Sequence, residues 1–464
     1  YHSTIVEPWD GPLLVAFTDG YSVGAVLDRN GLRPCRYYVT EEDRLIMASE
    51  TGVLDVDESE VKEKGRLQPG QMFLADADEG RIIPDEEVFE DLTDPKYRRW
   101  LNGKRVELDS VVENTRGEFE LPHPIDEDEM TRQQRAFGYT LEHLRRLVKP
   151  MSEDGKDPIG AMGNDTPLSV LSERNKTLFT YFKQLFAQVT NPPLDYIRED
   201  LVTSLESHIG RQNNLLGETP EHCRQLFLES PILSDEETAA IKEMDERDIE
   251  AYEIDITYRK DKSLRKAVED VRHEAVRAIT EGHEILVLSD RDTNEDRVPI
   301  PSLLAVGGIH HHLIREGLRT RVGLVLESGQ PCAVHHFCTL IGYGADAVNP
   351  YLAYESIRDM SYEGLIDEEA DEAIEKFVHA VEDGILKVMS KMGISTLESY
   401  KGAQVFEAVG LDSDFVDEYF YGTTARTEGV GIEEIEDDLL ERHDLAYESD
   451  VQSNLELDQG GELY

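Results

Sequence analysis

The sequence predicts a mixed α/β and α+β protein, with an antiparallel β unit followed by an α/β domain whose sheet is mostly parallel. Between residues 13 and 74, short apolar or β-branched runs alternate with turns that contain Asp-Gly and Asn-Gly pairs. Such pairs supply the positive φ that hairpin turns require. After about residue 240, apolar strands alternate with amphipathic helices, a pattern typical of a parallel sheet flanked by helices. A length of 464 residues is sufficient for two or three domains.

The β unit is predicted to contain five strands, at residues 13–17, 23–27, 36–39, 45–47 and 72–74. Five strands without helices cannot cover both faces of a sheet, so we expect helices from sequence that precedes Tyr1. Residues 84–130 are charged and show no apolar period. They predict an irregular linker that crosses a surface.

The next predicted helix begins at Thr131, where Thr131 and Gln134 can form a capping box. Four apolar residues recur on one face of this helix: Phe137, Leu141, Leu144 and Val148. Further helices are predicted near residues 178–189 and 193–209.

The α/β part shows its alternation most clearly after residue 284. Strands are predicted at residues 285–289, 323–326 and 347–349, and helices at 303–314, 335–341 and 368–392. The last helix is amphipathic, with a buried side that we expect to contain Ile374, Phe377, Val381, Ile385 and Val388.

The net charge of −50 is unusual for this length. A surface so negative repels nucleic acid and anionic membranes, so neither is expected as a partner. The acidic residues recur along the whole chain, which favours a halophilic protein in a salt-rich cytoplasm; an ordinary acidic enzyme is the alternative. No leader and no long apolar run is present, which predicts a cytoplasmic location. Both ends of the sequence suggest a fragment of a longer protein.

Two residue types invite a metal site. The four cysteines are Cys35, Cys223, Cys332 and Cys338, but an iron–sulfur cluster needs at least three close thiolates, so we expect buried apolar thiols. Histidines gather at residues 310–312 and 335–336. Consecutive helical residues point about 100° apart, which favours structural histidines over a zinc site, and no metal-binding residue is predicted.

Asp290 and Glu327 follow two predicted parallel strands, at the edge where α/β folds place ligands. A catalytic carboxylate is one interpretation. Helix capping or pairing with an arginine is the interpretation that we favour.

Several short segments carry a family resemblance. Glu7-Pro8-Trp9-Asp10-Gly11-Pro12, Leu27-Asp28-Arg29-Asn30-Gly31-Leu32-Arg33-Pro34 and Ala48-Ser49-Glu50 resemble the second half of class II glutamine amidotransferase domains, above all those of glutamate synthase. Later segments are similar to the glutamate synthase central domain and occur in the family's order. They lie at residues 160–167, 186–193, 286–291, 350–355, 389–395 and 406–411.

The resemblance implies a domain order. Residues 1–90 would be the C-terminal part of an amidotransferase domain of the Ntn type, and residues 91–130 a linker. Residues 131–435 would be the central domain, and residues 436–464 the start of a connector to an FMN-binding domain.

The resemblance also implies an activity. The family makes two glutamates from glutamine and 2-oxoglutarate through glutamine hydrolysis, internal ammonia transfer and FMN-dependent reduction. Electrons come from an NADPH-oxidising small subunit or from ferredoxin through an iron–sulfur cluster. The nucleophile, the FMN site and the cluster ligands would all lie outside this chain, so no catalytic or cofactor-binding residue is expected in it, and the chain alone is predicted to be inactive.

Three residues acquire candidate roles from the resemblance. Asp28 and Arg33 fall in the amidotransferase motif and are expected to support the glutamine pocket, either as an ion pair that stabilises the turn beside it or by direct contact with glutamine. Glu462 resembles a glutamate that signals between the two active sites. Two rival functions stay open: a stand-alone module that docks separate catalytic chains, and a metal hydrolase that uses the histidines.

Overall fold

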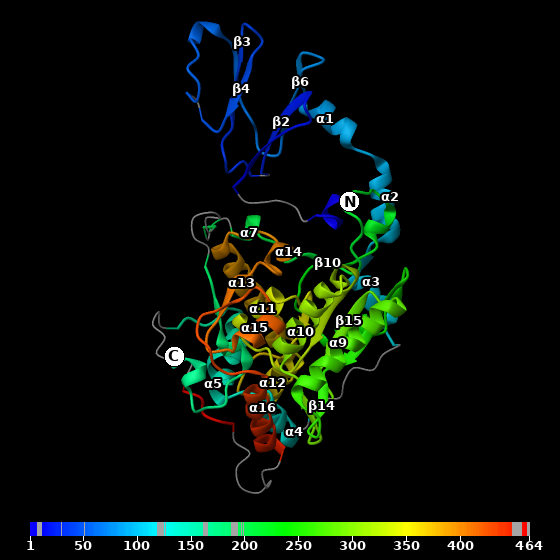
Figure 1. The fold of residues 1–464 in the computed structure, drawn as a ribbon, viewed down its shortest axis with the longest axis vertical. Coiled ribbons are helices and arrows are strands. Elements are labelled where there is room, and N and C mark those ends of the chain that lie inside the picture. Colours follow the sequence, from blue (N-terminus) through cyan, green and yellow to red (C-terminus); the bar gives the residue numbers. More distant parts are fainter. Residues whose placement is uncertain are drawn as a thin grey trace.

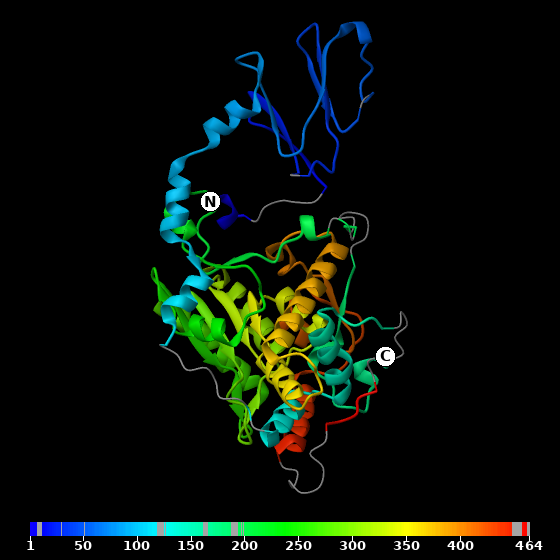
Figure 2. The same ribbon diagram turned by 180° about the vertical axis from the view of Figure 1, so that it is seen from behind.

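The computed structural model describes residues 1–6, 12–28, 30–50, 52–117, 125, 127–160, 166–186, 194–195, 197, 199–447 and 457–461. A small β unit stands at one end of the molecule, and a larger α/β body forms the other end (Figure 1). Helices α1 (Asp85–Leu92) and α2 (Pro95–Lys104) run between the two, as the view from behind also shows (Figure 2).

The β unit contains two antiparallel sheets. One has the order β1-β2-β6-β7 (Leu14–Thr18, Ser22–Leu27, Met72–Asp76, Arg81–Ile83), and the other has the order β4-β3-β5 (Leu45–Ala48, Arg36–Thr40, Val61–Arg66). All five predicted strands are confirmed. Strands β5 and β7 were not predicted, because the sequence of β5, Val-Lys-Glu-Lys-Gly-Arg, is mostly charged and exposed. The core between the sheets is small, with Ala25, Leu27, Cys35, Leu67 and Phe73 buried.

The prediction of an irregular stretch at residues 84–130 is wrong. It contains α1, α2, the short strand β8 (Val106–Glu107), helix α3 (Leu108–Thr115) and the start of α4 (Glu127–Ala136). Helix α2 begins where Asp94 accepts the amide of Lys96 and Pro95 occupies the first turn, and both features favour a helix start. Tyr1, Tyr97 and Trp100 pack against one another. The Tyr97 hydroxyl donates to Glu218, and Lys104 forms an ion pair with Glu221, which joins this helix to the α/β body.

Helix α4 begins before Thr131, so the predicted capping box does not exist. The predicted single helix is also broken: Gly138, at φ +81°, ends α4, and Thr140 then caps α5 (Leu141–His143). A π-helical stretch, Leu144–Val148, leads into α6 (Lys149–Asp154). Pro150 cannot donate to the helical ladder, which accounts for this distortion. Phe137, Leu144 and Val148 are nevertheless buried in the main core.

The helices predicted at residues 178–189 and 193–209 are also wrong where the structure describes them. Residues Leu178–Tyr181 form a 3-10 turn, followed by β9 (Phe182–Gln184). Only α7 (Glu199–Val202) is helical in the second range, which ends in β10 (Ser207–Ile209). Aromatic residues fit strands as well as helices, so their spacing was ambiguous.

The α/β body is built on a five-stranded sheet of order β12-β13-β15-β17-β18 (Asp245–Glu246, Ile249–Asp255, Ile285–Ser289, Gly323–Glu327, Ala347–Asn349). All neighbours from β13 to β18 are parallel, and β12 pairs antiparallel with β13. The mostly parallel sheet and its predicted strands are confirmed.

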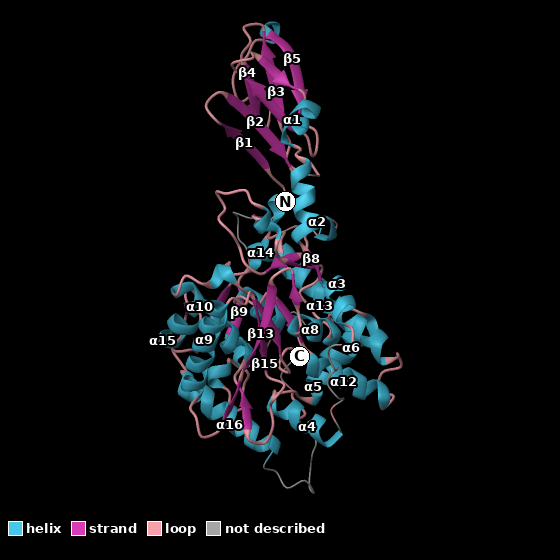
Figure 3. Ribbon diagram, turned by 90° about the vertical axis from the view of Figure 1, so that its right-hand side faces the viewer, coloured by secondary structure: helices cyan, strands magenta, loops and turns pink. Residues whose placement is uncertain are grey.

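Both faces of this sheet are covered. Leu286, Leu288 and Leu324 lie in the large core with α9, α10 and α11 (Leu264–Glu281, Ser302–Arg315, Val334–Gly342). Val287 and Val325 lie in a second core with α3 and α8 (Asp235–Lys242). Figure 3 shows α9 and α10 on one side of β13 and β15, and α3 and α8 on the other. This alternation follows from the two-residue period of a strand.

Further helices complete the large core: α12 (Tyr351–Tyr362), α13 (Ala370–Met392), α14 (Leu397–Tyr400), α15 (Ser413–Tyr419) and α16 (Ile432–Tyr447). The predicted buried side of α13 is confirmed, since Phe377, Val381 and Ile385 are fully buried. Three small sheets have the strand orders β10-β11-β8, β14-β16 and β20-β19-β9. The strands not yet introduced are β11 (Leu226–Leu228), β14 (Thr257–Arg259), β16 (Arg297–Pro299), β19 (Phe406–Ala408) and β20 (Thr424–Ala425). Among the described helices, none has the length and apolarity to cross a membrane.

Candidate functional site

The carboxyl ends of the parallel strands bring polar residues together, as predicted. Ser289 at the end of β15 pairs in register with Glu327 at the end of β17, and Glu327 pairs with Asn349 at the end of β18. Asp290 follows Ser289 directly, and its amide donates to the Glu327 carbonyl. Both predicted carboxylates therefore lie at one edge of the sheet.

Glu327 is 3% exposed and fully engaged. Its carboxylate accepts the Ser289 hydroxyl at 2.5 Å and the Lys242 ammonium at 2.6 Å, and it also forms an ion pair with Arg291. Burial alone raises the pKa of Glu327, but the charges of Arg291 and Lys242 outweigh it and hold the pKa below its usual value. Glu327 thus pairs with an arginine, as we expected.

The pair extends into a network. Arg291 donates to Asp235 at 2.8 Å, and its guanidinium lies over the Tyr351 ring at 4.2 Å. Asp235 also accepts from Arg358 at 3.1 Å. Each buried charge here has an opposite charge beside it, which is the condition under which buried ions are tolerated. The arrangement ties α8, α12 and the sheet edge together.

Asp290 differs from Glu327 because no cation contacts it among the described residues. It is fully buried, and its carboxyl group accepts the Ser328 hydroxyl at 2.5 Å and the Gly329 amide at 2.9 Å. Burial raises the pKa of Asp290 to about 7, and these hydrogen bonds only partly oppose the rise. Two adjacent carboxyl groups with separated pKa values are typical of acid–base sites, but Asp290 has no exposed surface that a substrate could contact.

Replacing Asp290 with asparagine should make the protein more resistant to alkaline pH. Because the pKa of the folded carboxyl lies above its unfolded value, the folded state holds the proton longer, and stability falls as pH rises through the window between the two values. From pH 6 to pH 8, the wild type should lose about 1 kcal/mol relative to Asp290→Asn. Urea unfolding at both pH values measures this difference.

The exposed neighbour Asp292 provides the matched control, and Asp292→Asn should leave the pH dependence unchanged. If Asp290→Asn and the wild type showed parallel pH profiles, the carboxyl group would not titrate in this window.

A second ionic cluster, at the opposite end of the sheet, was missed by the sequence reasoning. Asp346 accepts from Arg319 at 3.0 Å and from the Leu324 amide at 2.7 Å, and it forms an ion pair with Lys401. The cluster lines a cavity of about 160 Å³, together with His208 and His310. One signal could have revealed it: Asp346 is a single carboxylate within the apolar run Gly344-Ala345-Asp346-Ala347-Val348.

Asp28 organises the turn after β2. Its buried carboxylate accepts the amide of Leu32 at 2.9 Å and that of Asn30 at 3.1 Å, and its contact with the Leu13 amide is 3.4 Å long. The expected ion pair with Arg33 does not form between these two described residues, and Arg33 is exposed. An aspartate that accepts the amides following it is a common way to hold a turn.

The histidines have structural surroundings. His335 lies within 3.1 Å of the Phe179 carbonyl, and His336 stacks on the Phe179 ring and accepts the Cys332 amide. His310 accepts from Arg319 at 3.0 Å. Burial lowers the pKa of each of these three histidines. They are therefore neutral near pH 7 and contribute to packing and hydrogen bonding.

All four cysteines are buried and free, as expected. Burial raises the pKa of Cys332 and that of Cys338 to about 12. Both thiols are therefore protonated near neutral pH. Among the described residues, no group of three or more histidine, cysteine, aspartate or glutamate side chains is placed to hold a metal ion.

Some predicted positions lie outside the described residues. These are Glu462, residues 7–11 and 29 of the amidotransferase motif, and most of the segments at 160–167 and 186–193.

Two family models match the chain. The model "Glutamate synthase central domain" matches residues 132–412, and "Glutamine amidotransferases class-II" matches residues 1–100. Among curated relatives, a glutamate synthase [NADPH] large chain from Bacillus subtilis is 48% identical over 98% of this chain and 30% of its own length. A glutamate synthase [NADH] from Schizosaccharomyces pombe is 45% identical over 99% of this chain and 22% of its own length. A ferredoxin-dependent glutamate synthase 2 from Synechocystis is 42% identical over 96% of this chain and 29% of its own length. The chain therefore spans less than a third of the length of these relatives.

Proposed function

Because this chain belongs to the glutamate synthase family, we propose that it is the structural middle of a glutamate synthase large subunit, the part that holds two active sites at a fixed separation. The observation that carries the proposal is the saturation of its ionic groups. At both ends of the central sheet, a buried carboxylate pairs with two basic side chains: Glu327 with Lys242 and Arg291, and Asp346 with Arg319 and Lys401, beside a cavity of only about 160 Å³. A part built in this way can position reactive domains without reacting itself.

The proposed domain order follows the two matched regions. Residues 1–90 form the end of an Ntn-type amidotransferase domain, 91–130 a connection, 131–435 the central domain and 436–464 a connector to the FMN-binding domain. In the β unit, Asp28 would support the glutamine pocket by holding its turn, with Arg33 exposed beside it. Glu462 would signal between the two sites.

The whole protein would hydrolyse glutamine and transfer the ammonia internally to 2-oxoglutarate, with reducing equivalents from FMN and an iron–sulfur cluster. Electrons would come from an NADPH-oxidising small subunit or from ferredoxin, in the cytoplasm. Holding the two sites at a fixed distance raises the effective concentration of ammonia at the second site. The cluster ligands would come from other parts of the protein, because the described residues of this chain contain no group of three or more side chains that could hold a metal ion.

Isotope transfer tests this function. A protein that contains this chain within the full length of its relatives should convert glutamine labelled with ¹⁵N in the amide into labelled glutamate, even in excess unlabelled ammonium. The 464-residue chain alone should fold, release no ammonia from glutamine and bind no FMN. Dilution of the label by external ammonium would contradict internal transfer, and a yellow isolated chain would contradict the scaffold role.

The charge of −50 leads to a prediction about salt, because we propose that the protein is halophilic. Raising KCl from 0.1 M to 1 M shortens the screening length from about 10 Å to about 3 Å, which reduces the self-repulsion of the folded state. The midpoint of thermal unfolding should therefore rise by several degrees and then level off. A midpoint that falls or does not change across this range would contradict a halophilic design.

A further inference from the structure

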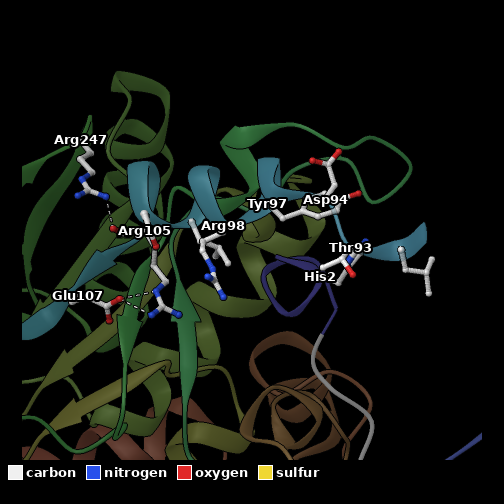
Figure 4. Close-up of a pocket in the computed structure, with 11 residues that line it drawn as sticks. His2, Thr93, Asp94, Tyr97, Arg98, Arg105, Glu107 and Arg247 are labelled. Atoms are coloured by element: carbon white, nitrogen blue, oxygen red, sulfur yellow. Dashed lines mark hydrogen bonds and ion pairs between the residues drawn. The ribbon is translucent and has the colours of Figure 1, made fainter. Parts of the chain in front are cut away.

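A cleft of about 580 Å³ lies between α2, residue His2 and the hairpin that joins β12 to β13. Figure 4 shows Arg98 and Arg105 pointing to the same side of α2, with Arg247 beside the end of that helix. The cleft is also lined by Asn102, Tyr97 and Leu101. Clefts of this size accommodate small metabolites.

The charges that face this cleft do not cancel. Its two carboxylates are already engaged: Glu107 binds Arg105 at 2.6 Å, and Asp94 caps α2 and binds Lys96 at 3.3 Å. Arg98 has no hydrogen-bonding or ionic partner among the described residues, and Arg247 donates only to the carbonyl of Arg105. The lining thus holds three arginines and two carboxylates, and Arg98 and Arg247 are its two arginines without a carboxylate partner among the described residues, in a chain whose net charge is −50.

The backbone at Arg247 adds an independent observation. Arg247 and Asp248 form the two-residue turn between β12 and β13, with φ of +51° and +65°. Turns of this type strongly favour asparagine and glycine, because other residues are strained at positive φ. An arginine in this position is therefore placed at a cost in backbone energy, and its side chain reaches the cleft.

We infer that this cleft binds a small molecule that carries at least two carboxylate or phosphate groups. A guanidinium group matches both oxyanions with two parallel hydrogen bonds. Arg98 and Arg247 belong to different elements that line the same cleft, so a ligand with two anionic groups can contact both. Arg105, paired with Glu107 and stacked over Phe227 at 4.6 Å, also lines the cleft.

Calorimetric titration of the 464-residue chain tests the site, with citrate and pyrophosphate as probes at constant ionic strength. Binding of citrate alone would identify a polycarboxylate ligand, and binding of pyrophosphate alone a phosphorylated one. Arg98→Gln should weaken binding about tenfold. Arg99→Gln, on the same helix but outside the cleft, should bind as the wild type does. If neither probe bound at about 10 mM, or if Arg98→Gln bound normally, the inference would be overturned.

Arg247→Gly separates binding from folding. Glycine tolerates positive φ, so this variant should keep the thermal midpoint of the wild type while binding the probe about tenfold more weakly. If Arg247 served only to cap α2, the substitution would lower the midpoint and leave binding unchanged, which would also overturn the site.

Discussion

Replacing Glu327 with alanine should lower the free energy of unfolding by about 3–5 kcal/mol. The carboxylate is 3% exposed and neutralises Lys242 and Arg291, which are themselves mostly buried. Its removal leaves these two cations with a weaker set of partners and leaves the Ser289 hydroxyl without its acceptor. Equilibrium urea unfolding, followed by far-ultraviolet circular dichroism, measures the change.

Glu253 is the matched control for this prediction. It binds the same Lys242 ammonium at 3.0 Å, but its side chain is 49% exposed. Exposed ion pairs contribute about 1 kcal/mol or less, so Glu253→Ala should be nearly neutral. Equal losses for the two variants would show that Lys242, rather than the burial of Glu327, determines the effect.

The second large effect is expected for Asp346→Ala, at the other end of the sheet, also at about 3–5 kcal/mol. The Asp346 side chain is 6% exposed, and that of its partner Lys401 is 11% exposed. Without Asp346, Lys401 keeps only Glu398 among the described residues, at 2.5 Å, and Arg319 keeps carbonyl acceptors and His310. Chemical unfolding at pH 7 should show the loss.

Acid titration gives this prediction a distinct signature. Burial raises the pKa of Asp346, but the charges of Lys401 and Arg319 outweigh it and hold the pKa below its ordinary value. The stabilisation is therefore complete above about pH 4 and disappears as pH falls towards the folded pKa. The difference in the free energy of unfolding between the wild type and Asp346→Ala should therefore shrink as the pH falls below about 4. Glu398→Ala, which removes a half-buried partner of the same lysine, should cost about 1 kcal/mol or less.

Strands and helices with a strong period were predictable from the sequence. The five strands of the β unit, the strands 285–289, 323–326 and 347–349 and the helix that ends at Met392 are all confirmed. Buried parallel strands are continuous apolar runs, and long amphipathic helices repeat their pattern several times. In these elements the apolar pattern is long or repeated several times, so it predicts both the type of the element and its position.

The errors lie where one local feature decides the structure. Helix α2 has the sequence Pro-Lys-Tyr-Arg-Arg-Trp-Leu-Asn-Gly-Lys, in which only Tyr97, Trp100 and Leu101 share an apolar face, too short a pattern to predict a helix. It is helical because Asp94 and Pro95 start it and because its aromatic residues dock on Tyr1, a contact between segments far apart in sequence. Gly138 had the opposite effect, since one left-handed residue interrupts an otherwise continuous period.

For the candidate site, the sequence could predict that Asp290 and Glu327 share an edge, because consecutive parallel strands end there. It could not predict that one carboxyl group would meet two cations and the other none. Lys242 is 85 residues from Glu327 along the chain, and Asp346 meets Lys401 from 55 residues away. Partner choice of this kind depends on tertiary packing, which no local pattern encodes.

The order of the parallel strands has a consequence for what this body can evolve to do. From β13 to β18 the order follows the chain without reversing, and the crossover helices α9, α10 and α11 all bury residues in the same core. Open α/β sheets bind their ligands at the topological switch point, where the strand order reverses and neighbouring loops diverge. No switch point occurs among the described strands of this sheet. Its carboxyl edge is closed by salt bridges, and a new catalytic pocket would more readily arise on the surrounding loops than at that edge.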